Sequence, residues 1–340
     1  MPLHLACGHG NKDIVKLLCE LGASTNQCTK EGFTHLHFLC VRDFTNKGVQ
    51  SIIKCPSVHE VDGSEYMQLI PAEDSSKDII KHLLNHGADI NSATTNGKTP
   101  IYLACEFDNV EAVKWLLHHE VDTNKCNDNG WSPLHIASMN GNEEYNTVKI
   151  FLKHGVSIDN CNEKGLTPLH CACSYGNKNI AEILINEGTA VNKVDNTGNT
   201  ALLFACNNMH NEIALVLLEN GAEVNDHDHN GRISLYSAAE DGNIDLIKIW
   251  LEQNADVNFK RNNVFTPIYI ACRAISKGNG NIVDLLIKNN ASVDIPDRTE
   301  STPLYIACQN RFKDVVELLL KHGSEVNNAA QVESEEGWTP

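Results

Sequence analysis

Long hydrophobic runs are missing from this sequence. No apolar stretch approaches the ~20 residues that a membrane-spanning helix needs, and the first residues have neither the basic region nor the apolar core of a secretory signal. Motifs of common chemistry are missing too, because there is no Cys-x-x-Cys pair, no HExxH motif and no recognisable Ser-His-Asp set. We therefore expect no membrane span in this chain, no cofactor and no metal, and we predict that the protein is not an enzyme.

Positive charge is also scarce. The chain has 44 acidic residues against 27 Lys and Arg, which gives a formal net charge of −17. This balance repels phosphate backbones and anionic membranes, so nucleic acid is a poor candidate ligand, and a protein with a basic or apolar segment is a better one. Thirteen cysteines, most of them expected to be unpaired, are typical of a reducing compartment. We expect a monomeric cytoplasmic protein, with the nucleus as an alternative location.

What the sequence does contain is a repeat of about thirty-three residues. Its frame glycines are Gly97, Gly130, Gly165, Gly198 and Gly231, which are 33, 35, 33 and 33 residues apart. A unit this short cannot bury its own apolar face, so it must stack on a copy of itself. The repeat therefore predicts an extended surface and no closed catalytic pocket.

Each unit has the local signals of two helices. A threonine before proline favours the start of the first helix, because its hydroxyl caps a backbone N–H and proline needs none at the first helical position. These threonines are Thr99, Thr167, Thr266 and Thr302. The second helix has apolar residues at helical spacing and ends at a slot that suits a left-handed residue. The slot holds Gly22, Gly87, Gly155, Gly188, Gly221 and Gly323, with Asn254 and Asn290 as substitutes and Glu120 as an exception.

This order of turn, Thr-Pro-Leu-His helix, reverse turn, second helix and Gly-Ala-Asp-Val-Asn resembles the ankyrin repeat. The resemblance covers nearly the whole chain. It implies an all-α repeat solenoid, in which helix-turn-helix units stack and β-hairpin fingers project. We expect one array over residues 1–340, cut through a unit at both ends. The predicted units are 1–31, 32–62, 63–96, 97–129, 130–164, 165–197, 198–230, 231–263, 264–299 and 300–336, and 337–340 would open another.

One stretch departs from the frame. Between Gly32 and Gly97 lie 65 residues, one short of two repeats. We interpret 32–62 and 63–96 as two decayed units. The alternative is a single unit that carries a long inserted loop, which is uncommon in compact arrays and is often functional where it occurs.

Cysteine and histidine fall mostly in repeat slots. Ten cysteines share two slots, and we interpret them as small apolar fillers. One slot holds Cys7, Cys40, Cys105, Cys173, Cys206, Cys272 and Cys308, and the other holds Cys28, Cys126 and Cys161. The fourth place of Thr-Pro-Leu-His holds His4, His37, His135 and His170, where the ankyrin resemblance implies hydrogen bonds within and between units. The metal candidates at 170–173 and 226–229 lack four convergent ligands.

Partner-facing positions follow from the resemblance, which places them just after the frame glycine and late in the first helix. Carried to this chain, the selected residues are Phe33, Phe107, Trp131, Met139, Asn140, Tyr175, Arg232, Glu240, Asp241 and Arg273. Aromatic residues and arginine are enriched at binding hot spots. We expect Trp131, Met139 and Tyr175 to form one apolar patch, and Glu240 with Asp241 to attract a basic segment.

The first functional hypothesis is a protein–protein interaction scaffold that binds a partner on the concave face of the solenoid. An alternative is the recognition arm of a larger enzyme or membrane channel whose other domains lie outside this sequence. A third idea treats Asn91, Asn225 and Asn327 as sites of asparaginyl hydroxylation, although a turn role also explains asparagine there.

Overall fold

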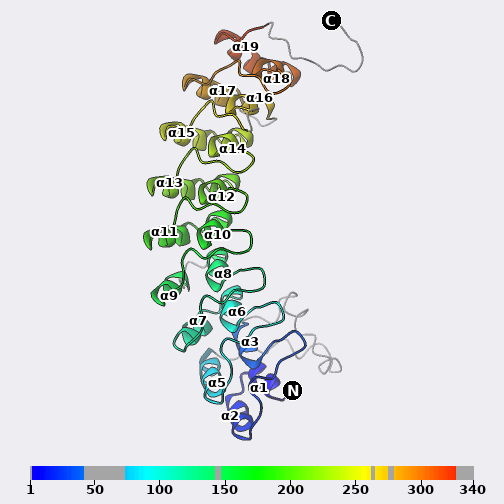
Figure 1. Ribbon diagram of the computed structural model, residues 1–340, viewed down its shortest axis with the longest axis vertical. Helices are drawn as coiled ribbons and strands as arrows, with labels where there is room; N and C mark the ends of the chain where they lie inside the picture. Colours follow the sequence, from blue (N-terminus) through cyan, green and yellow to red (C-terminus); the bar gives the residue numbers. More distant parts are fainter. Residues whose placement is uncertain (1, 42–72, 142–146, 262–264, 275–278, 327–340) are drawn as a thin grey trace, which may run out of the picture. The chain divides into compact units, whose positions relative to one another are not determined.

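The computed structural model describes residues 2–41, 73–141, 147–261, 265–274 and 279–326 (Figure 1). These residues form 18 helices, and they contain isolated β-bridges but no sheet. The chain divides into an N-terminal part, Met1–Thr189, and a C-terminal part, Ala190–Pro340, each of which is compact. The all-α repeat architecture predicted from the sequence is confirmed.

The helices of the N-terminal part form antiparallel pairs. Its first helices are α1 (Pro2–Gly8), α3 (His35–Cys40), α6 (Pro100–Glu106), α8 (Pro133–Asn140) and α10 (Pro168–Tyr175). Its second helices are α2 (Lys12–Glu20), α5 (Glu73–Asn85), α7 (Val110–Leu117), α9 (Thr147–Lys153) and α11 (Lys178–Asn186). First helices pack on first helices and second helices on second helices, so each pair contacts only its neighbours (Figure 1).

The C-terminal part repeats this arrangement with four pairs. The first helices are α12 (Ala201–Asn207), α14 (Ser234–Asp241), α16 (Pro267–Arg273) and α18 (Pro303–Gln309). The second helices are α13 (Asn211–Glu219), α15 (Ile244–Glu252), α17 (Asn279–Lys288) and α19 (Lys313–Lys321). In both parts the finger loops project on the side of the first helices (Figure 1).

The predicted helix ends are confirmed. The hydroxyls of Thr99 and Thr167 accept the backbone N–H three residues on, and proline occupies the first turn of each helix. Thr266 and Thr302 do the same. The glycines that end the second helices have positive φ, as have the substitutes Asn254 (60°) and Asn290 (68°). Glu120 keeps a negative φ and the turn closes through Val121 N–H to the carbonyl of His119.

The fingers are closed by tight turns. Thr94, for example, donates its N–H to the carbonyl of Lys98, and Gly97 donates to Thr94. A Cβ on Gly97 would meet the backbone nitrogen of Asp128 at 2.7 Å, because the next finger approaches it closely. Within the described residues, bridges of antiparallel type occur only at 194–200 and 261–265. The fingers are therefore turn-like loops that stack through single backbone hydrogen bonds.

The irregular stretch between Gly32 and Gly97 is described in part. Residues 42–72 lie outside the described residues, so the two predicted units 32–62 and 63–96 are not compared directly. The flanking helices α3 and α5 pack on each other; α3 also contacts α1 and α6, and α5 contacts α2 and α7. These are the neighbours of the first and second helix of one repeat. Nine helix pairs are present among the described residues, and the two units 32–62 and 63–96 stay a prediction.

The cysteine slots differ in burial. Cys7, Cys105 and Cys206, like three others of the first slot, are buried between first helices, as predicted for apolar fillers. Cys308 of the same slot is exposed in the last described pair. In the second slot, Cys28 and Cys161 are exposed, so the filler interpretation was wrong for them. That slot lies in the finger, beside solvent, and not between helices.

Candidate partner-binding surface

The histidines of the Thr-Pro-Leu-His slot connect successive repeats. The N–H of Ser132 donates to Nδ1 of His135 at 3.1 Å, so this nitrogen carries no proton. Nε2 therefore carries the proton, and it donates to the carbonyl of Leu166 in the next repeat at 2.9 Å. His37 makes the same pair of bonds, to Thr34 and to the carbonyl of Lys98. Burial lowers the pKa of His37 to about 4, so the ring is neutral near pH 7. These histidines hold the frame and do not shuttle protons.

Tyrosines in the same slot form hydrogen bonds through their hydroxyls to side chains of the next finger. The hydroxyl of Tyr102 accepts from Nδ2 of Asn127 at 3.2 Å. Tyr236 accepts from Nη1 of Arg261 at 3.0 Å, and Tyr269 donates to Asp297 at 2.7 Å. Each of these partners belongs to the next finger. The tyrosine repeats are thus joined through side chains that lie at the base of the exposed fingers.

In two repeats, the side chain just after the frame glycine contacts the side chain eight residues later, at the end of the first helix. Lys98, directly after a frame glycine, lies 2.7 Å from the carboxylate of Glu106 at the end of the first helix. At the same two positions, the guanidinium of Arg273 lies over the ring of Phe265, 5.7 Å from its centroid. Equivalent places are occupied by Trp131 with Met139, and by Arg232 with Glu240. A contact between the finger and the end of the first helix is thus present in the repeats of α6 and α16.

The predicted residues differ in accessibility. Tyr175 is 60 % exposed and projects from the end of α10. Asn140, Glu240, Asp241 and Arg273 are also exposed. Phe107, Trp131, Met139 and Arg232 are partly buried. Phe33 is only 8 % exposed because its ring packs against His37 and Phe38, which does not suit direct contact with a partner.

Asn140 has a structural role that the sequence did not indicate. Its Nδ2 donates to the carbonyls of Cys105 and Glu106, at 2.6 and 3.3 Å, and so satisfies the end of α6 in the preceding repeat. Asn177 does the same for Ser138 and Met139 at the end of α8. The only sequence signal is asparagine at the end of the first helix or in the turn after it, where asparagine is common for other reasons.

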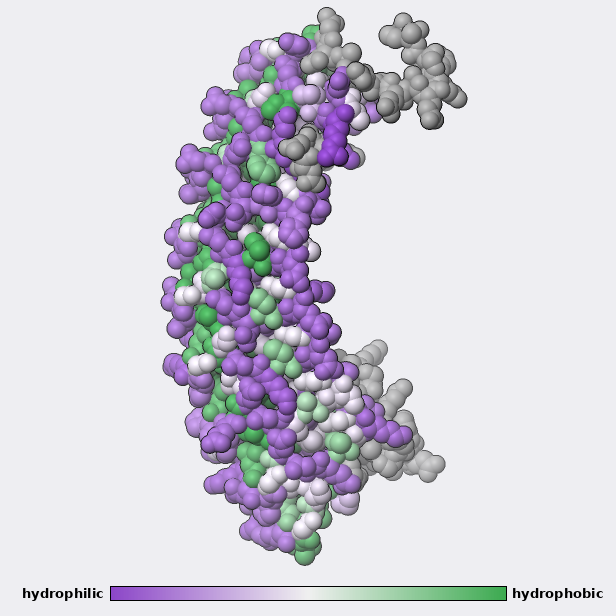
Figure 2. All heavy atoms as spheres, viewed as in Figure 1, coloured by the Kyte–Doolittle hydropathy of each residue, from purple (hydrophilic) through white to green (hydrophobic). Residues whose placement is uncertain are grey.

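Neighbouring charges act on the acidic pair Glu240 and Asp241. Partial burial and the neighbouring charge of Glu240 raise the pKa of Asp241, and the charge of Arg232 acts in the opposite direction. The acidic pair therefore lies beside a cation of the same repeat. On the face shown in Figure 2, hydrophilic side chains dominate, with apolar ones scattered between them.

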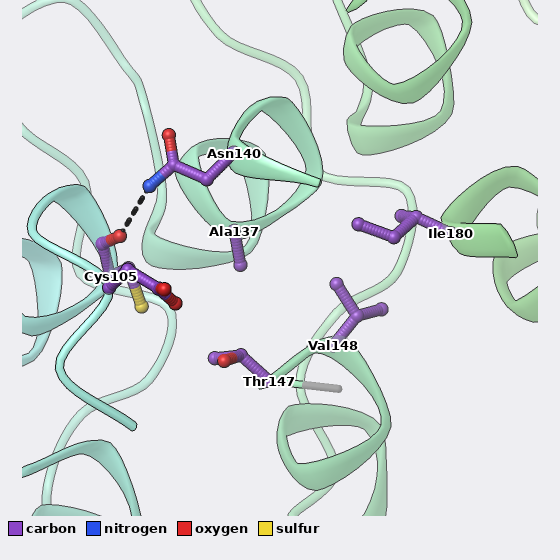
Figure 3. Close-up of a pocket in the computed structure, with 7 residues that line it drawn as sticks. Cys105, Ala137, Asn140, Thr147, Val148 and Ile180 are labelled. Atoms are coloured by element: carbon purple, nitrogen blue, oxygen red, sulfur yellow. Dashed lines mark hydrogen bonds between the residues drawn. The ribbon is translucent and has the colours of Figure 1, made fainter. Parts of the chain in front are cut away.

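A small hollow lies between α6, α8, α9 and α11 (Figure 3). It has room for about one water molecule. Ala137, Val148 and Ile180 form its apolar side, and Asn140 turns its amide toward the carbonyl of Cys105. The hollow is too small for a substrate.

No metal site is found in the part of the chain that is described. No three His, Cys, Asp or Glu side chains there are grouped to hold a metal ion, including the candidates at 170–173 and 226–229. Burial raises the pKa of Cys171 and of Cys206 to about 12, so both thiols stay protonated. None of the helices that the structure describes is both long and apolar enough to cross a bilayer.

The asparagines named as hydroxylation candidates take part in a ladder between repeats. Asn91 accepts from the N–H of Asp122 at 2.8 Å, and Asn225 accepts from the N–H of Asp256 at 2.8 Å. The third candidate, Asn327, lies outside the described residues. The ladder is sufficient to explain why asparagine stands at these positions.

The chain matches the sequence models of a known protein family. It matches the family described as "Ankyrin repeats (3 copies)" over residues 69–160, 142–228 and 231–330, and "Ankyrin repeat" over residues 1–30. The chain belongs to the ankyrin repeat family. Ankyrin repeats generally mediate protein–protein interactions, and proteins of this family are typically non-enzymatic scaffolds.

Two fowlpox virus (strain NVSL) proteins that are named for their ankyrin repeats resemble part of the chain. FPV222 is 29 % identical over 119 residues, which is 33 % of this chain and 16 % of that protein. FPV115 is 29 % identical over 109 residues, which is 32 % of this chain and 19 % of that protein. The matched regions thus span less than a fifth of either relative.

Proposed function

We propose that this ankyrin array is an interaction scaffold that binds a partner protein on the side formed by the fingers and the first helices, the concave side expected for the family. One observation carries the proposal. The two positions that meet in the repeats of α6 and α16 hold different chemistry in each, whereas the bonds beneath them recur. Lys98 with Glu106 is an ion pair, Phe265 with Arg273 a cation–π pair.

A rigid frame suits this role. Its His, Tyr and Asn bonds fix the fingers before any partner arrives, so the ordering cost of binding is small. In the N-terminal part, Trp131 and Met139 occupy one such position pair, and the exposed Tyr175 stands in the next repeat. The proposed partner contributes an apolar segment there.

The experiment is affinity capture followed by crosslinking and mass spectrometry with the whole chain. We expect the double variant Trp131→Ala, Tyr175→Ala to lose the partner while its helicity stays intact. Leu215→Ala is the control, because Leu215 is 37 % exposed on α13, a second helix. Equal recovery with both variants would reject this surface.

A second candidate is the recognition arm of a larger enzyme or channel. It is favoured by one observation, that the matched regions are a small share of the fowlpox relatives. A catalytic motif or membrane span encoded in the same reading frame outside residues 1–340 would decide for it.

The remaining expectations are part of the proposal: a cytoplasmic or nuclear monomer, formed by one array of units, that needs no cofactor and binds no nucleic acid. Light scattering of the purified chain tests the monomer, and a mass that grows with concentration would contradict it. Electrophoretic mobility of mixed DNA and RNA with the chain tests the last point.

A further inference from the structure

Arginine is unevenly distributed in this chain. The sequence has six arginines: Arg42, Arg232, Arg261, Arg273, Arg298 and Arg311. Arg42 lies outside the described residues, and residues 43–231 contain none. The last five form the set that we call the arginine surface, and they fall in three successive repeats of the C-terminal part.

Four of the five lie in fingers or at the ends of first helices, and Arg311 lies in the turn between α18 and α19. Arg232 follows a frame glycine before α14, Arg261 and Arg298 lie in fingers, Arg273 ends α16, and Arg311 follows α18. The second helices of these repeats have lysine instead, and three of these lysines pair with acids of their own helix. The pairs are Lys248 with Asp245, Lys288 with Asp284 and Lys313 with Glu317.

Two of the arginines are held on aromatic rings. Arg261 lies 5.0 Å from the ring centroid of Tyr236, and its Nε–H and Nη1 donate to the carbonyl of Asn230 and the hydroxyl of Tyr236. Because a guanidinium has five N–H donors, three remain for a ligand. Arg273 is exposed and lies over Phe265. Stacking fixes the plane of each fork, which lowers the entropy lost when it binds a planar anion.

Acidic side chains on this side limit the surface. Asp297 is already engaged, because it accepts from Tyr269 and from the N–H groups of Thr299 and Ser301 in its own turn. Glu240 and Asp241 stand at the end of α14 and act on Arg232, so the arginines of the α16 and α18 repeats are better placed for an anionic ligand than Arg232. With a net charge of −17, much of the rest of the chain repels such a ligand.

We propose that the arginine surface binds a carboxylate-rich segment, with several Asp or Glu side chains, of a partner protein. The inference rests on the proposed scaffold function and names the partner chemistry of its C-terminal part. Arginines spread along successive repeats suit a row of carboxylates, and the stacked forks of Arg261 and Arg273 can each take one of them. A single phosphate group would need several arginines at one point.

The test is fluorescence anisotropy of the whole chain with a labelled oligoglutamate peptide. A length-matched oligoglutamine peptide and a neutral peptide with one phosphoserine are the comparisons. We expect oligoglutamate to bind more tightly than both and to weaken as salt rises. Arg273→Gln should weaken binding about tenfold, the range of one or two charge-assisted hydrogen bonds. Arg273→Lys keeps the charge and loses the fork, so its affinity for oligoglutamate should lie between those of the unaltered chain and Arg273→Gln.

The matched control is Lys288→Gln on α17, which removes the same charge from the other side of the stack. Its affinity should stay within about twofold of the unaltered chain, as expected for a screened surface charge. Equal losses in Arg273→Gln and Lys288→Gln would overturn the proposal, as would equal affinity for oligoglutamate and oligoglutamine, or preference for the phosphoserine peptide. Circular dichroism checks that each variant is folded. The outcome is independent of the Trp131 and Tyr175 test, because those residues lie in the N-terminal part.

Discussion

Thr189 donates its hydroxyl to the carboxylate of Asp159 in the preceding repeat at 2.5 Å. Most repeats have asparagine at the position of Asp159 and an apolar residue, usually alanine, at that of Thr189. Asn192, for example, donates to the carbonyl of Gly221 and accepts from Glu223, beside Ala222. The carboxylate of Asp159 has no N–H to donate, so it accepts a hydrogen bond from the hydroxyl of Thr189 instead. Asp294 with Ser324 repeats the substitution at 2.6 Å.

We predict that Thr189→Ala lowers the free energy of unfolding by about 1–2 kcal/mol, because it removes a hydrogen bond to a charged group that is partly buried. Asp159→Asn in the same background should restore most of the loss by recreating the common Asn–Ala pair. Urea denaturation of the two single variants and the double variant measures the coupling. Strict additivity of the two changes would contradict the pairing.

The frame glycines should be less tolerant than the glycines that end second helices. Gly97 and Gly87 both have positive φ, but only at Gly97 would a Cβ meet neighbouring backbone within 3 Å. Gly87→Ala should cost about 1–2 kcal/mol for the left-handed conformation alone. Gly97→Ala adds a displacement of the next finger, so we expect a clearly larger loss in thermal stability. Equal shifts in Tm would show that the fingers move apart freely.

Acid should destabilise the array through its buried histidines. Burial lowers the pKa of His37 to about 4, below the ~6.5 of the unfolded chain. The stabilising contribution is present above pH 6.5 and is lost as pH falls toward 4, because the unfolded state binds the proton first. Loss on the order of 3 kcal/mol is expected from this one group by pH 4. Urea midpoints between pH 4 and 7 should depend less on pH in His37→Gln than in the unaltered chain.

Thiol labelling should separate the cysteine slots. Cys28 and Cys161 are exposed, whereas Cys171 and Cys206 are buried with their pKa raised to about 12 by burial. Brief iodoacetamide treatment of the folded chain, followed by peptide mass mapping, should modify the first two and leave the second two intact. Rapid modification of Cys206 would mean that the first helices separate readily.

Local signals predicted much of this fold. The caps at Thr99 and Thr167 and the left-handed Asn254 depend on neighbours within a few residues, so the sequence was sufficient for them. The burial of Phe33 and the capping by Asn140 depend on contacts with other helices and rings, which a repeat frame does not specify. The contact of α3 with α5 could not be predicted from spacing. The 65 residues from Gly32 to Gly97 are one short of two repeats, so the spacing suggests two decayed units there.

The two side chains that meet eight residues apart, after the frame glycine and at the end of the first helix, can change together during evolution. Since both side chains stand outside the bonds that join repeats, a pair such as Lys98 and Glu106 can be exchanged for another pair without disturbing its neighbours. Selection would then change what the scaffold recognises two side chains at a time, in one repeat, while the joints on either side keep their strength.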